Sequence, residues 1–108
     1  MADTHKPAQP GVVIAAVDDR HAEVVLTGEV DVLMLRDLEA RLADPRLGKA
    51  EHWVLDMRGV TRMELACAYA VLRAVTLHSG TTAVCGPRRA VLRTLRDAGL
   101  DRAVTIEE

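Results

Sequence analysis

The sequence predicts a small single-domain α/β protein with a mixed β-sheet covered by helices. Its 108 residues fit one domain, since a domain usually has about 100 to 200 residues. Short β-branched runs alternate with segments of helical period, in the order strand, strand, helix, strand, helix, strand, helix, with room for a short final strand. Strands that alternate with helices imply parallel pairing, so only the opening hairpin adds an antiparallel edge.

The first half of the chain predicts a tail and then a hairpin. Residues 1–11 contain two prolines and few apolar side chains, so we expect a flexible tail that precedes a domain spanning residues 12–108. Residues 12–17 and 22–28 are short, β-branched runs separated by a polar Asp-Asp-Arg-His turn. Two such runs across a tight turn predict two antiparallel strands.

A helical period begins after the hairpin. From Asp31, which can cap the first turn, leucines recur at helical spacing until Asp44-Pro45. The residue before a proline disfavours the helical conformation, so we expect the helix to stop there. A polar link then leads to a third strand at residues 52–57.

The second half predicts two more helices. A long helix is expected over residues 62–78, opened by a capping box in which Thr61 and Glu64 satisfy each other's backbone amides. A fourth strand at 82–85 and a third helix follow, and residues 103–106 can form the final edge strand. The third and fourth strands are almost continuously apolar, which predicts burial on both faces.

Composition excludes several classes of function. Trp53 and Tyr69 are the only aromatic residues, and the net charge is −2, so neither ring stacking nor a global positive field favours nucleic-acid binding. No apolar run is long enough to span a bilayer and the first ten residues lack a signal-peptide core. We therefore expect a cytoplasmic protein without membrane insertion. Trp53 is expected in the core, with an exposed partner anchor as the alternative.

The cysteines and histidines show no metal-ligand spacing. Cys67 and Cys85 have small or apolar neighbours and no Cys-x-x-C pattern, which favours reduced core thiols. The four histidines are dispersed, so no metal site is expected. No cofactor is expected either.

Three stretches together resemble one family. Residues 26–31, Leu-Thr-Gly-Glu-Val-Asp, are similar to an L-x-G-E-L-D strand end, and residues 54–61 resemble V-L-D-L-S-G-V-x. Residues 80–101 are similar to the family's last strand and helix. In this order and spacing the stretches resemble the STAS domain, best known from anti-sigma factor antagonists of bacterial regulatory switches.

The resemblance implies a phosphorylation switch that this chain lacks. The family carries D-S-[ST]-G-L at the start of its second helix, and a partner that is both serine kinase and anti-sigma factor phosphorylates the second hydroxyl. Unphosphorylated antagonist binds that partner and frees the sigma factor. The matching residues here run from Glu64 to Ala68, so the acid is kept as Glu64 while Ala66 takes the phosphoacceptor position. Because alanine has no hydroxyl, phosphorylation at Ala66 is not expected.

The resemblance implies a non-catalytic module that binds an anti-sigma factor or serine kinase-like regulatory protein. We expect its docking surface in residues 57–69 and the neighbouring loop at 29–33, because both leave the same edge of the parallel strands. The individual candidates are Glu29, Asp31, Arg58, Thr61, Arg62, Glu64, Leu65, Ala66, Cys67 and Tyr69.

Several alternatives stay open at this point. Single STAS domains also bind the ATPase subunit of bacterial lipid ABC transporters, so an accessory subunit is the second hypothesis. A small enzyme that uses Cys67 with Glu64 is the third, although no base, orienting group and oxyanion hole accompany them. Thr61 and Thr27 are alternative phosphosites, and a homodimer is left open.

Overall fold

The computed structural model describes residues 11–108. In this range the chain forms five strands, four α-helices and a 3-10 turn at Leu100–Arg102. The elements are β1 Gly11–Val17, β2 His21–Val30, α1 Leu35–Leu42, α2 Pro45–Lys49, β3 His52–Met63, α3 Leu65–Leu77, β4 Thr81–Cys85, α4 Arg89–Asp97 and β5 Thr105–Glu107. The predicted order of elements is therefore confirmed, with one additional short helix.

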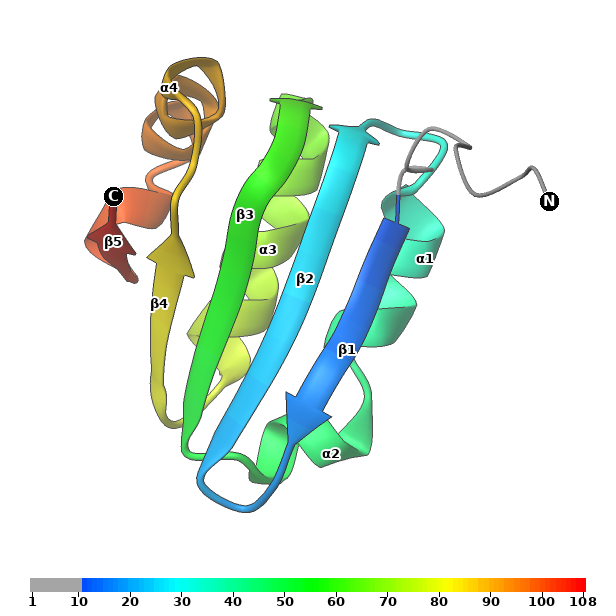
Figure 1. Ribbon diagram of the computed structural model, residues 1–108, viewed down its shortest axis with the longest axis vertical. Coiled ribbons are helices and arrows are strands. Elements are labelled where there is room, and N and C mark those ends of the chain that lie inside the picture. Colours follow the sequence, from blue (N-terminus) through cyan, green and yellow to red (C-terminus); the bar gives the residue numbers. More distant parts are fainter. Residues whose placement is uncertain (1–10) are drawn as a thin grey trace, which may run out of the picture.

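The five strands form one mixed sheet in the order β1-β2-β3-β4-β5 (Figure 1). Strand β1 pairs antiparallel with β2, and every other neighbouring pair is parallel. Val24, Leu55 and Val84 are aligned across the three middle strands, and all three are fully buried. The predicted mixed sheet with one antiparallel edge is confirmed.

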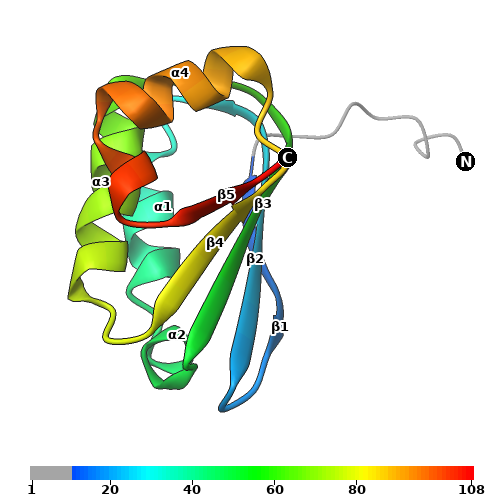
Figure 2. The same cartoon turned by 90° about the vertical axis from the view of Figure 1, so that its left-hand side faces the viewer.

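All four helices lie on the same side of the sheet (Figure 2). The core fills the space between them, where strand residues such as Leu26 and Met57 meet Leu38 of α1, Val71 of α3 and Leu95 of α4. The predicted burial of β3 and β4 on both faces is confirmed only in part, because on the face without helices Asp56 and Ala83 are buried whereas Val54 and Cys85 are partly exposed. Alternate strand residues point to opposite faces, and a run of apolar residues does not reveal which faces a helix will cover.

The opening hairpin and its flanks follow the prediction closely. The Asp18 carboxylate accepts hydrogen bonds from the backbone amides of Arg20 and His21, both at 2.8 Å, which fixes the tight turn. Of the predicted tail, residues 1–10 lie outside the described residues. Gly11, which was also assigned to the tail, is the first residue of β1.

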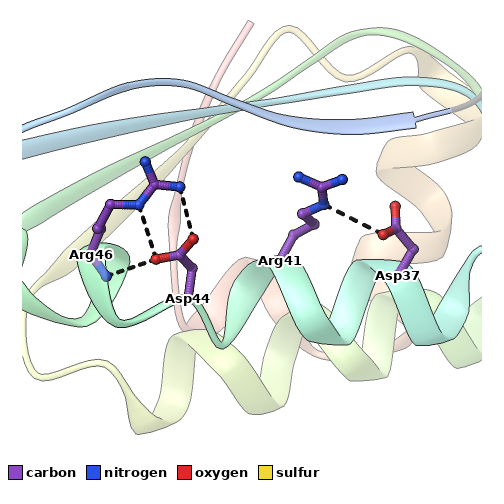
Figure 3. Close-up of polar contacts among 4 residues, drawn as sticks. All are labelled: Asp37, Arg41, Asp44 and Arg46. Atoms are coloured by element: carbon purple, nitrogen blue, oxygen red, sulfur yellow. Dashed lines mark hydrogen bonds and ion pairs between the residues drawn. The ribbon is translucent and has the colours of Figure 1, made fainter.

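The link after α1 contains a short helix, α2, that was not predicted from the sequence. Asp44 does lie beyond the end of α1, but it also caps α2 by accepting the Arg46 amide at 2.9 Å, with Pro45 as the first helical residue (Figure 3). Proline is well suited to this position because its missing amide would have no helical partner there. The same dipeptide thus ends one helix and begins the next.

Trp53 lies in the core, with 2% of its surface exposed. Its indole Nε1 donates to the Leu47 carbonyl oxygen at 2.7 Å, and its ring stacks on His78 with centroids 4.1 Å apart. The core prediction is confirmed, and the alternative of an exposed partner anchor is wrong. His78 in turn donates from Nε2 to the Ala50 carbonyl oxygen at 2.7 Å.

Candidate functional site

Strands β2 and β3 end side by side at the upper edge of the sheet in Figure 1. Glu29 is in register with Arg62, and Val30 with Met63. The two chain segments that leave this edge lead to α1 and α3. The carboxyl ends of neighbouring parallel strands are a common place for binding sites, and most of the candidate residues predicted from the sequence lie here.

Three hydrogen bonds connect the two segments. The Glu64 amide donates to the Val30 carbonyl oxygen at 2.9 Å, and the Val32 amide donates to Glu64 Oε1, also at 2.9 Å. The Cys67 thiol donates to the Asp31 carbonyl oxygen at 3.2 Å. The start of α3 and the β2–α1 loop therefore form one connected structure.

The predicted capping box between Thr61 and Glu64 is wrong. Strand β3 continues to Met63 and α3 begins at Leu65, three residues later than expected, with Glu64 as its N-cap and no side-chain cap. Pairing with β2 keeps this segment extended, so Thr61 is an exposed strand residue. The Glu64 carboxylate instead binds the Val32 amide and lies 3.4 Å from the Arg62 guanidinium.

Exposed apolar side chains gather on these two segments. Residues 11–108 contain six large apolar side chains that are exposed, and four of them are Val32, Leu33, Leu65 and Tyr69. We call these four residues the apolar cluster. Leu33 is 90% exposed, which is unfavourable for a side chain without a partner. Contiguous exposed apolar residues often mark a surface that binds another protein.

Val32 and Leu33 were not among the individually predicted residues. They lie between the strand-end motif and the first helical leucine, and α1 begins only at Leu35. The Asp31 carboxylate accepts a hydrogen bond from the Leu33 amide at 3.0 Å. This bond stabilises a turn, so Val32 and Leu33 lie outside the helix. Val32 and Leu33 could have been identified from the sequence, because they are two adjacent apolar residues that do not belong to the apolar face of the predicted helix.

Ala66 lies on the first turn of α3 and is exposed. It lies between Leu65 of the apolar cluster and the buried Cys67. A hydroxyl at position 66 would be accessible to a kinase, whereas the methyl group present cannot accept phosphate. Of the alternative phosphosites, Thr61 is exposed in β3 and Thr27 is half-buried in β2.

Arg58 is separated from the other candidates. Its guanidinium binds the Asp56 carboxylate through Nε at 3.0 Å and Nη2 at 2.8 Å. Asp56 is flanked by Leu55 and Met57, which are buried against the helices, so it lies on the opposite face of the sheet. The bidentate hydrogen bonds from Arg58 hold the pKa of Asp56 below its usual value. The Arg58 stem crosses Gly86, where an added Cβ would collide with it.

The two cysteines are free thiols with different surroundings. Cys67 is fully buried and Cys85 is partly exposed. Burial, and then the nearby Glu64 carboxylate, raises the pKa of the Cys67 thiol. A raised pKa suppresses the thiolate form, which is the nucleophile. This environment favours a packing role for Cys67.

Two further features of residues 11–108 bear on the class of site. No group of three or more His, Cys, Asp or Glu side chains in this range could hold a metal ion. None of the helices in the same range is long and apolar enough to cross a membrane.

Comparison with known proteins identifies the family. Residues 15–107 match the family model described as "Mlab, STAS domain". The chain belongs to the STAS domain family. This confirms the resemblance found in the sequence, including the α/β fold that it implied. No curated protein matches the STAS chain described here at a significant level.

Solved structures share the STAS fold at low sequence identity. An anti-sigma factor antagonist from Mycobacterium paratuberculosis has a TM-score of 0.77 at 17% identity, with 94% of this chain and 88% of that chain covered. The unphosphorylated form of the anti-sigma factor antagonist SpoIIAA has a TM-score of 0.70 at 13% identity, with 91% and 89% covered. The phosphorylated form of the Bacillus cell fate determinant SpoIIAA has a TM-score of 0.67 at 16% identity, with 91% and 92% covered.

Proposed function

We propose that this STAS domain is a non-catalytic docking module that binds an anti-sigma factor-like regulatory protein without a phosphorylation switch of its own. The observation that carries the proposal is the apolar cluster. Its members Leu65 and Tyr69 lie on the first turns of α3, where the family's phosphoacceptor would lie, and Val32 and Leu33 lie on the loop that is hydrogen-bonded to Glu64. The structural similarity to anti-sigma factor antagonists supports the class of partner.

The chemistry of the surface supports docking to a protein. Val32, Leu33, Leu65 and Tyr69 supply apolar contact area, while Glu29 and Arg62 are exposed charged residues beside it. Protein interfaces commonly combine an apolar centre with a polar rim. The hydrogen bonds of Glu64 and Cys67 hold the two segments together before binding, which lowers the entropic cost of forming a complex.

The absence of a hydroxyl at Ala66 supports constitutive binding. A phosphate at this position would add about two negative charges next to Leu65 and close in sequence to Glu64. Such a group would oppose burial of the apolar cluster in an interface. With alanine at this position, the kinase activity of a partner has no acceptor here, and docking would be controlled by the concentrations of the two proteins.

A matched pair of leucine variants tests the proposed surface. Leu33→Asp places a charge in the apolar cluster, and Leu77→Asp makes the same change at the other end of α3, where Leu77 is 87% exposed. Titration calorimetry against candidate anti-sigma factor kinases should show at least about tenfold weaker binding for Leu33→Asp, the effect expected for a central interface residue. Leu77→Asp should bind like the wild type. Equal binding by all three proteins would overturn the proposed surface.

The second candidate is an accessory subunit of a lipid ABC transporter. The description of the matching family model names Mlab and does not name an anti-sigma factor antagonist. The STAS family also includes domains that bind a transporter ATPase. The same leucine variants can be titrated against such an ATPase subunit. Binding to the ATPase alone would replace the anti-sigma factor with this partner, and genes for a permease and an ATPase beside this one would point the same way.

The third hypothesis, an enzyme that uses Cys67 with Glu64, receives the least support. The Cys67 thiol is buried and donates its proton to the Asp31 carbonyl oxygen, while the Glu64 carboxylate is occupied by the Val32 amide. Neither group is presented to a substrate. Alkylation of the thiols that leaves partner binding intact would dismiss a catalytic role.

A further inference from the structure

A hollow with largely apolar walls lies between α1, α2 and α3, at the opposite end of α3 from the apolar cluster. Its volume is about 390 Å³. Sites for small molecules typically have volumes of about 300 to 1,000 Å³, apolar walls and a few polar groups. The apolar part of the wall is formed by Leu42, Pro45, Trp53, Ala70, Ala74 and Leu77.

The hollow exists because small residues face it. Ala70 and Ala74 lie on α3, and Gly48 lies on α2, where an added Cβ would meet no atom within 4 Å. The floor is rigid, because the Trp53 indole is stacked on His78 and hydrogen-bonded to the Leu47 carbonyl oxygen. Only 2% of the Trp53 surface is exposed, so the apolar residues around the indole supply most of the surface that a hydrocarbon or aromatic group would contact.

One cation on the rim is available to a ligand. Arg73 donates from Nη2 to Glu39 Oε2 at 2.8 Å, but both side chains are largely exposed, and exposed ion pairs of this kind are weak. A guanidinium has five N–H donors, so Arg73 can bind a second anion while it keeps its ion pair with Glu39.

The other anion on the rim is already neutralised. Asp44 accepts hydrogen bonds from Arg46 through Nε at 3.1 Å and Nη2 at 2.8 Å (Figure 3). These bonds lower the pKa of Asp44 to about 2. Since Arg46 balances this charge, Asp44 does not leave an unpaired negative charge that would repel an anionic ligand.

We propose that this hollow binds a small amphipathic anion. The hydrocarbon or aromatic body of the ligand lies against the apolar and small residues of α2 and α3, above the buried Trp53, and its anionic group binds Arg73. The site is separate from the proposed docking surface, and it does not depend on the identity of the protein partner.

The single tryptophan allows a direct test on the full chain. Trp53 is the only tryptophan and lies in the floor of the hollow, so energy transfer from it reports binding of a naphthalene dye nearby. The probe is anilinonaphthalene sulfonate, an apolar anion, and its matched neutral control is N-phenylnaphthylamine, which lacks the sulfonate. We expect saturable transfer to the anion and at least about tenfold weaker binding of the neutral dye, the effect of losing one charged hydrogen bond.

Variants assign the binding to this hollow. Gly48→Leu and Ala74→Leu place a side chain in the hollow, and Arg73→Gln removes its cation; each should weaken binding of the anionic dye by at least about tenfold. Arg93→Gln makes the same charge change on α4 and should bind like the wild type. A thermal unfolding transition shows whether each variant is folded. If Ala74→Leu does not fold, Gly48→Leu alone tests whether filling the hollow abolishes binding.

Four outcomes would overturn the proposal. The first three are the absence of saturable transfer in the wild type, unchanged binding in folded Gly48→Leu, and a loss of binding in Arg93→Gln equal to that in Arg73→Gln. The fourth is equal affinity for the two dyes, because the hollow would then select apolar groups without regard to charge, as a pocket for a partner's side chain does.

Discussion

Replacing Glu64 with alanine removes the hydrogen bond that the Glu64 carboxylate accepts from the Val32 amide of the β2–α1 loop at 2.9 Å. A hydrogen bond to a charged group contributes about 1.5 to 3 kcal/mol when it is well shielded. The Glu64 side chain is 35% exposed and Val32 is exposed as well, so water replaces part of the contact. The ion pair with Arg62 is exposed and adds little.

We therefore expect Glu64→Ala to lower the free energy of unfolding by about 1 to 2 kcal/mol, and the Tm by about 4–10 °C. Urea unfolding followed by Trp53 fluorescence measures the change, and the m-value should stay the same. Hydrogen exchange of the Val32 amide should become faster. Glu29→Ala, at an exposed position near the end of the neighbouring strand β2, is the control and should change stability by less than about 0.5 kcal/mol.

The reasoning would be refuted by a Glu64→Ala midpoint equal to that of Glu29→Ala with unchanged exchange at Val32. In that case the two segments would be held together by the backbone bond between Glu64 and Val30 and by packing alone. The start of α3 would then not depend on the Glu64 carboxylate.

Three other predictions concern the opposite face of the sheet and the thiols. Asp56→Asn should cost about 1 to 2 kcal/mol at pH 7. Because Arg58 lowers the pKa of folded Asp56, this contribution is fully present above the unfolded pKa of about 3.9 and is lost as the pH falls through the lower folded pKa. The difference between variant and wild type in urea unfolding should therefore shrink as the pH is lowered below about 3.9. Gly86→Ala should cost at least about 1 to 2 kcal/mol in the same assay, because φ is 64° at this position and the Arg58 stem occupies the space of the new methyl group. Iodoacetamide should alkylate Cys85 before Cys67 in the folded protein, as read by peptide mass mapping, and faster modification of Cys67 would contradict its burial and raised pKa.

The elements that could be predicted from the sequence are those with a strong local pattern. The β-branched runs gave β1 and β2, and the leucine period gave α1 within a few residues. Helix α2 was missed because Asp44-Pro45 is a stop signal for one helix and a start signal for the next. The end of β3 was placed too early because its last residues are held by pairing with β2, up to Val30 and Met63, and this long-range contact leaves no local signal.

The candidate site was predicted in outline from the resemblance and from the adjacency of parallel strand ends. The sequence could indicate that residues after β2 and β3 meet, but not that Glu64 turns away from Thr61 to bind the Val32 amide. It also placed Arg58 on the docking surface, whereas this side chain lies with Asp56 on the other face of the sheet. The exposure of Leu33 depends on where α1 begins, which the leucine period alone does not determine.

Native mass spectrometry after incubation with ATP and a candidate anti-sigma factor kinase tests the central claim most directly, because one spectrum reports both the complex and the covalent state of the chain. The account predicts a complex in which this chain keeps its unmodified mass, and loss of that complex in Leu33→Asp but not in Leu77→Asp. A stoichiometric phosphate on the chain, or no complex with any such kinase, would contradict it.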